Sequence, residues 1–569
     1  MRYSSLLLLA IFAACGGEPP ADSVYTNGKI YTVNEEQPWA EAVAIKDGRF
    51  VYVGDNSGAE EFLGGDVTAT DLDGRMVIPG IVDAHTHLGQ IELIQYNAYF
   101  TETKRSEFLA ELEAYAKENP GEDWVLGCCW PVFEFVNGPD GPDRIELDTI
   151  FPERPVWIVS DAGHSSWLNS LALDALGLDA DSPDPKFPIA MYKRDDDGRL
   201  TGWVKEGAAW QRMEEVWPTD QALHEEGMRS MLQYLSEHGV TTLYDAGNKH
   251  RNDEIYGFFA DLEEAGKLPV RIDGAYRIST PDRRELAITE MKRLRKLYGG
   301  ESLRFTTVKL FMDGVHENRS GAQLAPYADD PDYRSDTTLS VDELKNYLIR
   351  LHEERFDLHV HVIGDLATKR VLDAVEQARA TVGDDFYPRV SVGHVQNTDP
   401  GDFPRFAELD VSANFTPWWF GVDDPDPAAP GLGPELTNDT YRARAIADAG
   451  GNVTFSSDDW TLDVLSPYLG MQVGHTRQYP REWLEPHQDP DATRLPESEQ
   501  LPIDLLIKGY TLNGAYQLRK EEDLGSIETG KIADLVVLPN NLFDTPKYEL
   551  HKTKPDAVIM DGIVIQGEL

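Results

Sequence analysis

Residues 76–87 read MVIPGIVDAHTH, an apolar run that ends in two histidines one residue apart. Side chains alternate between the faces of a β-strand, so His85 and His87 are expected to project side by side from a strand end. Two neutral imidazoles held at a fixed spacing are a good start to a metal site. A pair of surface histidines at a strand end is the simpler alternative, and the rest of the chain decides between the two.

The middle of the chain alternates short apolar runs with helix-like stretches, which predicts an α/β fold with a parallel sheet and crossover helices. The candidate strands lie at 77–83, 240–245, 270–274, 305–311, 358–362, 390–395, 411–415 and 453–455. Eight strands are the number that closes a (β/α)8 barrel, the TIM barrel. The long gap after the first strand predicts an insertion over residues 100–237, rich in Trp and acidic helices.

Short strand-like runs broken by turn signals flank this central region on both sides. Asp47-Gly48 and Asp73-Gly74 are hairpin signals of this kind. Neither flank has enough strands for a good sheet of its own. We therefore expect residues 24–76 and 520–569 to form one small composite β-sandwich domain beside a barrel domain that spans 77–519.

Potential metal ligands occur at or near the ends of five of the eight predicted strands, where the active groups of such barrels sit. They are His85 and His87 after the first strand, Lys309 in the fourth, His361 in the fifth, His394 in the sixth and Asp458 after the eighth. This order is hard to obtain by chance. It favours a metal-dependent active site over isolated surface histidines.

With these positions the chain resembles the amidohydrolase superfamily, and more closely its amidohydrolase-3 (YtcJ-like) branch. The motifs that carry the resemblance are PGIVDAHTH at 79–87, DAGHSSWLNS at 161–170, GVTTLYDAG at 239–247, KLFMDG at 309–314, HVIGD at 361–365, Ser457-Asp458 and GSIETGKIADL at 525–535. They are specific for the family and say little about substrate. The resemblance implies a metal-dependent hydrolase on a (β/α)8 barrel with a small composite β domain.

The same resemblance implies a role for each ligand position. Two histidine pairs would hold two metals: His85 and His87 the more buried one, His361 and His394 the more exposed one. Asp458 would bind metal and act as the general base. Lys309 matches the position where this branch can carry a carboxylated lysine that bridges two metals. Zn2+ is the expected ion, as one or two per chain, with other divalent metals as alternatives.

Several of these positions also have a structural alternative. Lys309 could instead be a buried lysine paired with Asp313. His359 lies one layer deeper in its strand and is expected to be a packed core histidine. In the insertion, His164 is interpreted as a substrate contact rather than a loop histidine. Trp418 follows the seventh strand and is assigned to substrate binding, although aromatic packing is equally consistent with its position.

The implied reaction is hydrolysis of a C–N bond in an amide, N-acyl, formamide or cyclic imide-like group. A metal-activated water would attack the carbonyl, with Asp458 as the base. Ester cleavage is chemically close, so a metal-dependent esterase is one alternative. A non-catalytic lipoprotein that kept the barrel as a metal- or ligand-binding scaffold is the other.

The charge balance restricts the partners. The chain has 52 lysine and arginine residues against 99 aspartate and glutamate residues, a net charge of −47. Such a chain has no basic excess to neutralise phosphates, which argues against nucleic acid and against broad contact with anionic lipid. The expected partner is a small-molecule substrate. The oligomeric state is left open, with a homodimer among the options.

Residues 1–15 combine one positive charge, a short apolar run and the sequence Ala13-Ala14-Cys15, a pattern typical of a secretory signal. The run is too short to span a bilayer. Because it resembles the lipobox of bacterial lipoproteins, we predict a lipidated Cys15, a flexible tether over 16–23 and a location on the periplasmic face of the bacterial cell envelope, at the outer membrane. An ordinary cleaved signal peptide is the alternative.

Cys128 and Cys129 are the other cysteines of the chain. Adjacent cysteines rarely pair, because their Cα atoms are too close for relaxed disulfide geometry. The sequence therefore predicts no disulfide framework and a fold stabilised by a large core.

Overall fold

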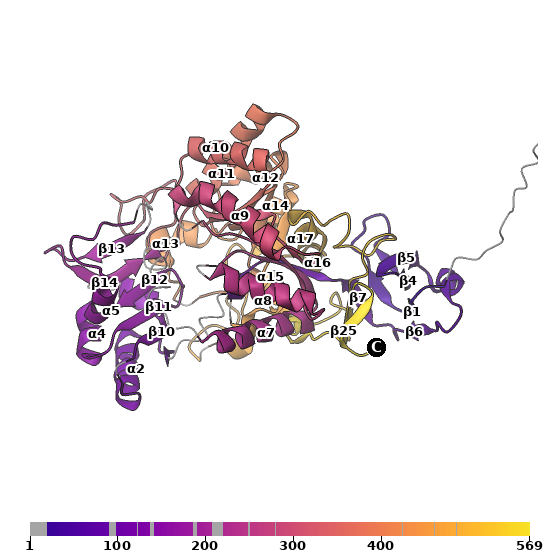
Figure 1. The fold of residues 1–569 in the computed structure, drawn as a ribbon, viewed down its shortest axis with the longest axis horizontal. Coiled ribbons are helices and arrows are strands. Elements are labelled where there is room, and N and C mark those ends of the chain that lie inside the picture. Colours follow the sequence, from indigo (N-terminus) through magenta and orange to yellow (C-terminus); the bar gives the residue numbers. More distant parts are fainter. Residues whose placement is uncertain are drawn as a thin grey trace, which may run out of the picture.

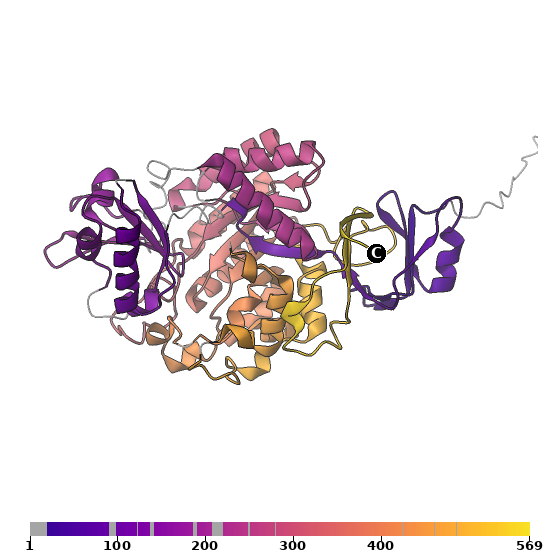
Figure 2. The same ribbon diagram turned by 90° about the horizontal axis from the view of Figure 1, so that it is seen from below.

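The computed structural model describes residues 20–89, 98–121, 123–136, 141–185, 190–206, 220–248, 251–278, 280–423, 425–459, 461–484 and 486–569. The predicted signal segment with Cys15, and residues 16–19 of the predicted tether, lie outside them, so the membrane anchor stays a prediction. The described chain forms three lobes in a row: the insertion, a central α/β body and a β lobe (Figures 1 and 2). None of its described helices is long and apolar enough to cross a membrane.

The central body holds two sheets of parallel strands. The first has the order β17 (Leu303–Arg304), β16 (Arg271–Gly274), β15 (Val240–Asp245), β8 (Ile81–Thr86). The second has the order β18 (Thr307–Phe311), β19 (Asp357–Val362), β20 (Val390–His394), β21 (Val411–Phe415), β22 (Val453–Phe455). Nearly all of their side chains are buried, as expected for parallel strands covered by helices.

Backbone contacts connect the two sheets at both of their junctions. At one junction the amide of Lys309 donates to the carbonyl of Tyr276 (3.2 Å), and the amide of Ile278 donates to the carbonyl of Lys309 (2.9 Å). At the other, the amide of Asp458, just after β22, donates to the carbonyl of His85 in β8 (3.0 Å). The ends of the predicted first, fourth and eighth strands therefore lie close together.

Helices surround these sheets, among them α7 (Gln221–Glu237), α8 (Asn252–Glu264), α9 (Arg284–Tyr298), α10 (Val341–Glu354) and α11 (Asp365–Val382) (Figure 1). Helix α10 shows how the sequence determines where such a helix begins and which face it buries. It begins at a capping box, in which Ser340 accepts from the amide of Glu343 and Glu343 accepts from the amide of Ser340. Its apolar residues recur on one face and are buried: Leu344, Leu348 and Leu351.

The strand predicted at 77–83 is two strands. Residues Met76–Pro79 form β7, which belongs to the β lobe, and β8 begins at Ile81. The division falls at Gly80, where a Cβ atom would lie 2.3 Å from the Thr241 hydroxyl. Only glycine lets the chain pass between the two lobes so closely. A continuous apolar run does not show such a division, because both halves are buried.

The β lobe draws strands from both flanks of the central body. Its larger sheet has the order β25 (Ile563–Gly567), β24 (Ala557–Met560), β23 (Leu535–Leu538), β7, β2 (Lys29–Tyr31), β3 (Trp39–Ala40). A smaller sheet has the order β5 (Arg49–Gly54), β4 (Ala42–Lys46), β1 (Ser23–Thr26), β6 (Ala69–Asp71). One apolar cluster joins them: Val43, Phe50, Val77, Leu535 and Ile559 are among its members.

The insertion contains a sheet of its own, in the order β13 (Met191–Arg194), β14 (Leu200–Lys205), β12 (Ser165–Leu168), β11 (Val156–Ser160), β10 (Val125–Trp130), β9 (Ala98–Tyr99). Helices α2 (Arg105–Glu118) and α4 (Arg144–Ile150) pack on it through apolar side chains. The loop between β11 and β12 carries His164. Helix α7 packs against β15 and so lies with the helices of the central body.

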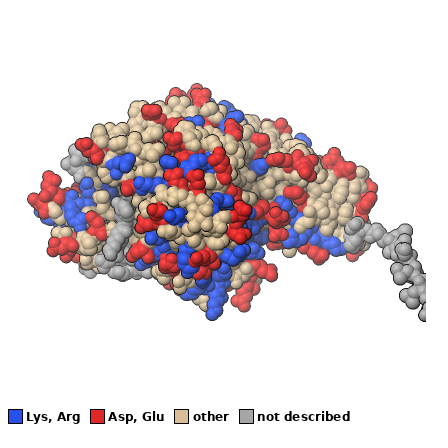
Figure 3. Space-filling model, turned by 90° about the horizontal axis from the view of Figure 1, so that it is seen from above, with Lys and Arg blue, Asp and Glu red and all other residues tan. Residues whose placement is uncertain are grey.

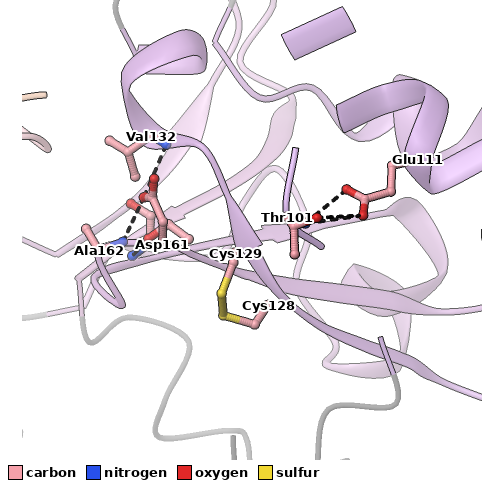
Figure 4. The surroundings of a disulfide bond; sticks show 9 residues. Thr101, Glu111, Cys128, Cys129, Val132, Asp161 and Ala162 are labelled. Carbon is pink, nitrogen blue, oxygen red and sulfur yellow. Dashed lines mark hydrogen bonds between the residues drawn. A yellow bond between two sulfur atoms is a disulfide. The ribbon is translucent and has the colours of Figure 1, made fainter. Parts of the chain in front are cut away.

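Cys128 and Cys129 form a disulfide, with their Cα atoms 3.6 Å apart (Figure 4). The expectation that they stay unpaired was wrong. Cys129 has a φ of 89°, and the register of β10 against β11 shifts between Cys128 and Trp130. Cys129 thus leaves the regular ladder, and the bulge lets two neighbouring sulfur atoms meet. The adjacency of the two cysteines in the sequence does not reveal this backbone conformation.

Candidate active site

A cavity of about 1050 Å³ lies between the strand ends of the central body and the insertion lobe. Its floor is formed by side chains in or just after the carboxyl-terminal halves of parallel strands, including His87, Lys309, His361, His394 and Asp458. Its wall on the other side includes residues of the insertion: Thr101, Cys129, Asp161, His164 and Glu206. Thr101 and Asp161 flank the disulfide in Figure 4. The cavity is large enough for a small-molecule substrate.

The floor brings the predicted metal-site residues together. Potential ligand atoms of His85, His87 and Asp458 all lie within 4.8 Å of one another. Oδ1 of Asp458 is 3.5 Å from Nε2 of each of these two histidines, and its Oδ2 is 3.1 Å from Nδ1 of His394. All four side chains are buried. A set of imidazoles around one carboxylate has the composition of a zinc site.

Lys309 and His361 complete the cluster. Nζ of Lys309 is 3.1 Å from Nε2 of His85, and the ring of His361 is 4.4 Å from that of His394. Asp313 forms no ion pair with Lys309, in the part of the chain that the structure describes. Its carboxylate accepts instead from the backbone amides of Ala322 (2.8 Å), Ile363 (2.9 Å) and Gly364 (2.8 Å). The alternative Lys309–Asp313 pair is therefore absent.

Burial determines the protonation of the cluster. It lowers the pKa of His87 to about 3 and the pKa values of His85 and His361 well below the usual value. These imidazoles are therefore neutral at neutral pH, the form that binds metal. Burial alone would raise the pKa of Asp458, but His394, His87 and Lys309 outweigh it and lower that pKa to about 2. Burial lowers the pKa of Lys309 to about 7.

A second layer of groups orients the histidines. His87 donates from Nδ1 to the carbonyl of Gly247 (3.1 Å), which leaves its Nε2 facing the cluster. Nδ1 of His85 lies 2.9 Å from Nε2 of His359, and Nδ1 of His359 lies 2.7 Å from the hydroxyl of Ser391. His359 is buried as expected, and it also positions His85. The sequence signal for this role was its place two residues before His361, on the same face of the strand.

The donor set fits a divalent metal ion on two further observations. Nδ1 of His394 is buried and has no hydrogen-bond partner among the described residues, since its contact with Asp458 lies outside hydrogen-bond geometry. His394 and Asp458 also have φ values of 76° and 41°, a conformation that costs energy for residues with side chains. Unsatisfied buried polar atoms and backbone strain gather where a ligand would compensate for them.

The insertion contributes a charged pair to the cavity wall. Nδ1 of His164 lies 2.7 Å from Oε2 of Glu206, and the His164 ring is 5.6 Å from that of His361. Buried Glu206 also accepts from the side-chain amide of Asn318 (3.2 Å) and from the hydroxyl of Ser320. Glu206 belongs to none of the motifs and was missed. His164 lines the cavity, and its role as a substrate contact stays a prediction.

Two tryptophans close another part of the wall. Trp418 lines the cavity and donates from its indole nitrogen to the carbonyl of Ser457 (2.8 Å). Trp419 stacks on His394, with ring centroids 5.3 Å apart. Trp418 therefore both contacts the segment after β22 that carries Asp458 and offers a surface to the cavity.

Comparisons with known proteins agree with this architecture. The chain is 27% identical to the putative amidohydrolase YtcJ of Bacillus subtilis, over 95% of this chain and 99% of that protein. It is 25% identical to the N-substituted formamide deformylase of Arthrobacter pascens, over 95% and 98%. An uncharacterized metal-dependent hydrolase from Pyrococcus horikoshii has the same fold, with a TM-score of 0.67 at 21% identity, over 92% of this chain and 99% of that one.

The match to a family spans most of the molecule. Residues 68–566 fit the model of the amidohydrolase family, which includes every motif on which the resemblance rested. The mixed α/β content agrees with it. The chain belongs to the amidohydrolase family.

Proposed function

We propose that this protein is a metal-dependent hydrolase of C–N bonds in linear or cyclic amides, N-acyl compounds or formamides. The observation that carries the proposal is the buried group of His85, His87 and Asp458, whose ligand atoms lie within 4.8 Å of one another at the floor of a cavity. The formamide deformylase among the relatives supports a C–N bond as the target.

The fold proposed for this function is a (β/α)8 barrel formed by both parallel sheets. The bridge between Arg277 and Lys309 and the contact between Asp458 and His85 support it, because they connect the sheets at both junctions. The sequence-based division of the chain is a barrel over 77–519, with an insertion at 100–237, and a β-sandwich from 24–76 and 520–569. Two boundaries shift in the structure, because β7 belongs to the β lobe and α7 lies with the helices of the central body. Active groups then sit at the carboxyl ends of the barrel strands.

The proposed metal ligands are those of the cluster: His85, His87, Lys309, His361, His394 and Asp458. A bound divalent ion, with Zn2+ as the first choice, supplies a Lewis acid and lowers the pKa of a water molecule. Asp458 accepts the proton of the attacking water, since its low pKa keeps it a carboxylate. It then gives that proton to the leaving nitrogen, so that one amide and one water yield a carboxylic acid and an amine.

Lys309 is proposed to be carboxylated. Its pKa of about 7 leaves much of the amine neutral at physiological pH. A neutral amine can attack CO2, forming an N–C bond and releasing one proton to give an anionic carbamate. Such an oxygen ligand suits a divalent ion better than an ammonium does. The 3.1 Å contact with His85 places Nζ at the cluster.

The test combines metal analysis and hydrolysis on the same sample. Protein purified without chelator should contain at least about one divalent metal per chain and hydrolyse N-formyl or N-acetyl amides. Removal of the metal with a chelator should abolish turnover, and Zn2+ should restore it. Hydrolysis that persists in metal-free protein would refute the proposal. Aryl esters cleaved without any amide cleavage would favour the esterase, and bound metal without turnover would favour a binding protein.

A further inference from the structure

One cation on the cavity wall is not explained by the metal cluster. Arg277 follows β16, and its guanidinium carbon lies 4.4 Å from the centroid of the Phe311 ring. The same ring stacks with His361 (4.8 Å), and the ammonium of Lys309 lies 5.2 Å from its centroid. The Phe311 ring therefore contacts both Arg277 and His361, which is a proposed metal ligand.

Arg277 makes no side-chain hydrogen bond or ion pair with any residue that the structure describes. The other arginines buried near acidic groups differ from it. Arg271 binds Asp534 and Asp561, and Arg494 binds Asp423 and Asp426. These two buried guanidinium groups are thus paired with carboxylates, whereas the half-buried guanidinium of Arg277 has no such partner among the described residues.

The carboxylates nearest to Arg277 along the cavity have other partners. Glu206 is held by His164, Asn318 and Ser320, and Asp458 lies against His394. Desolvation lowers the pKa of Arg277 to about 10, so the guanidinium remains charged at neutral pH. A partly desolvated cation without a partner is costly, which is why buried charges are normally paired.

The backbone around Arg277 is also fitted closely. Gly247 has a φ of 85°, and a Cβ atom there would lie 3.0 Å from both Cβ and the backbone nitrogen of Arg277. Glycine at this position gives Arg277 the space to keep its place beside Phe311. The same Gly247 carbonyl accepts from His87, so the loop that positions a metal ligand also positions the guanidinium.

We propose that Arg277 binds a carboxylate of the substrate, and that the substrates are N-acyl or N-formyl compounds carrying a carboxylate near the scissile bond, as in an N-acylated amino acid. This inference rests on the proposed C–N hydrolysis. The planar guanidinium matches a carboxylate with two parallel hydrogen bonds. The carboxylate lies beside Phe311 while the scissile carbonyl lies at the metal cluster.

The test uses two substrates that differ only in the carboxylate: N-formylphenylalanine and N-formylphenethylamine. The wild type should prefer the acid. Arg277→Met should lower kcat/KM for the acid by about 10- to 100-fold, mainly through KM, the usual worth of a charge-assisted hydrogen bond. It should change kcat/KM for the neutral substrate by less than about threefold, and Arg277→Lys should retain part of the preference.

Arg283 offers a matched control, because it is an exposed arginine at the rim of the same cavity. Arg283→Met removes the same charge and should leave the ratio between the two substrates unchanged. An equal loss of Arg277→Met on both substrates would overturn the inference, since it would assign Arg277 to the reacting carbonyl or to structure. A wild type without preference for the acid would also overturn it.

A binding measurement separates this inference from the proposed hydrolysis. Calorimetry on metal-loaded protein compares 3-phenylpropanoate with 3-phenylpropanamide. The wild type should bind the acid more tightly, and Arg277→Met at equal metal content should lose that difference. A carboxylate that binds to the metal alone would bind both proteins equally and would overturn the inference. If no amide is hydrolysed, the proposed function fails, while this comparison still decides the role of Arg277.

Discussion

Asp458, the proposed general base, is held in place from two sides. His394 lies 3.1 Å from one of its carboxylate oxygens, and the backbone amide of Asp458 donates to the carbonyl of His85. Asp458→Asn keeps the shape but cannot accept the proton. We expect a normal fold and a loss of roughly 100-fold or more in kcat. Metal content is measured on the same sample, and near-wild-type turnover at full metal occupancy would place the base elsewhere.

Lys309 tests the carbamate. Its amine is buried beside His85, with no carboxylate partner in the described part of the chain. Lys309→Ala should lower the metal content, because the variant would lack the oxygen ligand that the proposed carbamate would supply. Added acetate or propionate should restore part of the metal and of the activity, since a short acid can fill the space. A variant that keeps its metal without added acid would show that Lys309 is not a ligand.

His87 makes the stability of the metal-free protein depend on pH. Its pKa is about 3 in the folded chain, against about 6.5 in an unfolded one. The unfolded state therefore binds more protons between these values, and stability falls as the pH drops from about 6.5 toward 3. With chelator present, the melting temperature of the wild type should fall across this range. His87→Gln should fall less steeply, and an unchanged slope would contradict the assigned shift.

Strand β20 shows how a whole element shapes the site. Gly393 lies in it, directly before His394, and a Cβ atom there would be 2.8 Å from Nε2 of His359 and 3.2 Å from Nδ1 of His85. Gly393→Ala should leave the protein folded but displace these rings, and so weaken metal binding by about 10- to 100-fold. The measurement is metal retained against a competing chelator.

A second glycine provides the control for that experiment. In helix α8, a Cβ atom on Gly257 would meet only the Tyr298 ring at 3.6 Å, an ordinary contact. Gly257→Ala should keep the metal affinity of the wild type and stabilise the helix slightly. If both alanine variants behave alike, the spacing between β20 and its neighbours does not control the site.

At the level of elements, the sequence predicted the parallel strands and the positions of the candidate ligand residues along them. This was possible because buried parallel strands are continuous apolar runs and because the ligands end such runs. The division at Gly80 and the Cys128–Cys129 bulge depend on neighbours far away in the chain. Glu206 and Arg277 carry no motif, and only the folded chain brings them to the cavity.

At the scale of the whole molecule, the excess of acidic residues describes the surface and does not mark a binding site. Acidic and basic side chains are interspersed over the face shown in Figure 3, despite the net charge of −47. The cation that we expect to bind an anion, Arg277, instead lines the cavity. Specificity for an anion would therefore depend on Arg277 and its surroundings. Interactions with exposed charges more than about 10 Å away are largely screened at ordinary salt.

The β lobe connects distant parts of the chain, which gives a prediction for truncation. Strand β7 pairs with β23 along its whole length. Deleting residues 535–569 should leave the apolar edge of β7 unpaired and make most of the protein insoluble. Deleting only 562–569 removes β25, an edge strand with largely exposed side chains, and should leave a soluble protein. Soluble yield and metal content of both variants check this.

The pairing of β7 with β23 also imposes a delay during synthesis between the appearance of β7 and that of its partner. Roughly 450 residues separate the two strands, so a ribosome adding on the order of 5–20 residues per second needs roughly 20–90 s to deliver the partner of β7. During that interval β7 has already been synthesised, and the edge that pairs with β23 has no partner. The β lobe is therefore begun before the central body and completed after it, and a chaperone that covers β7 would act before the proposed metal site is complete.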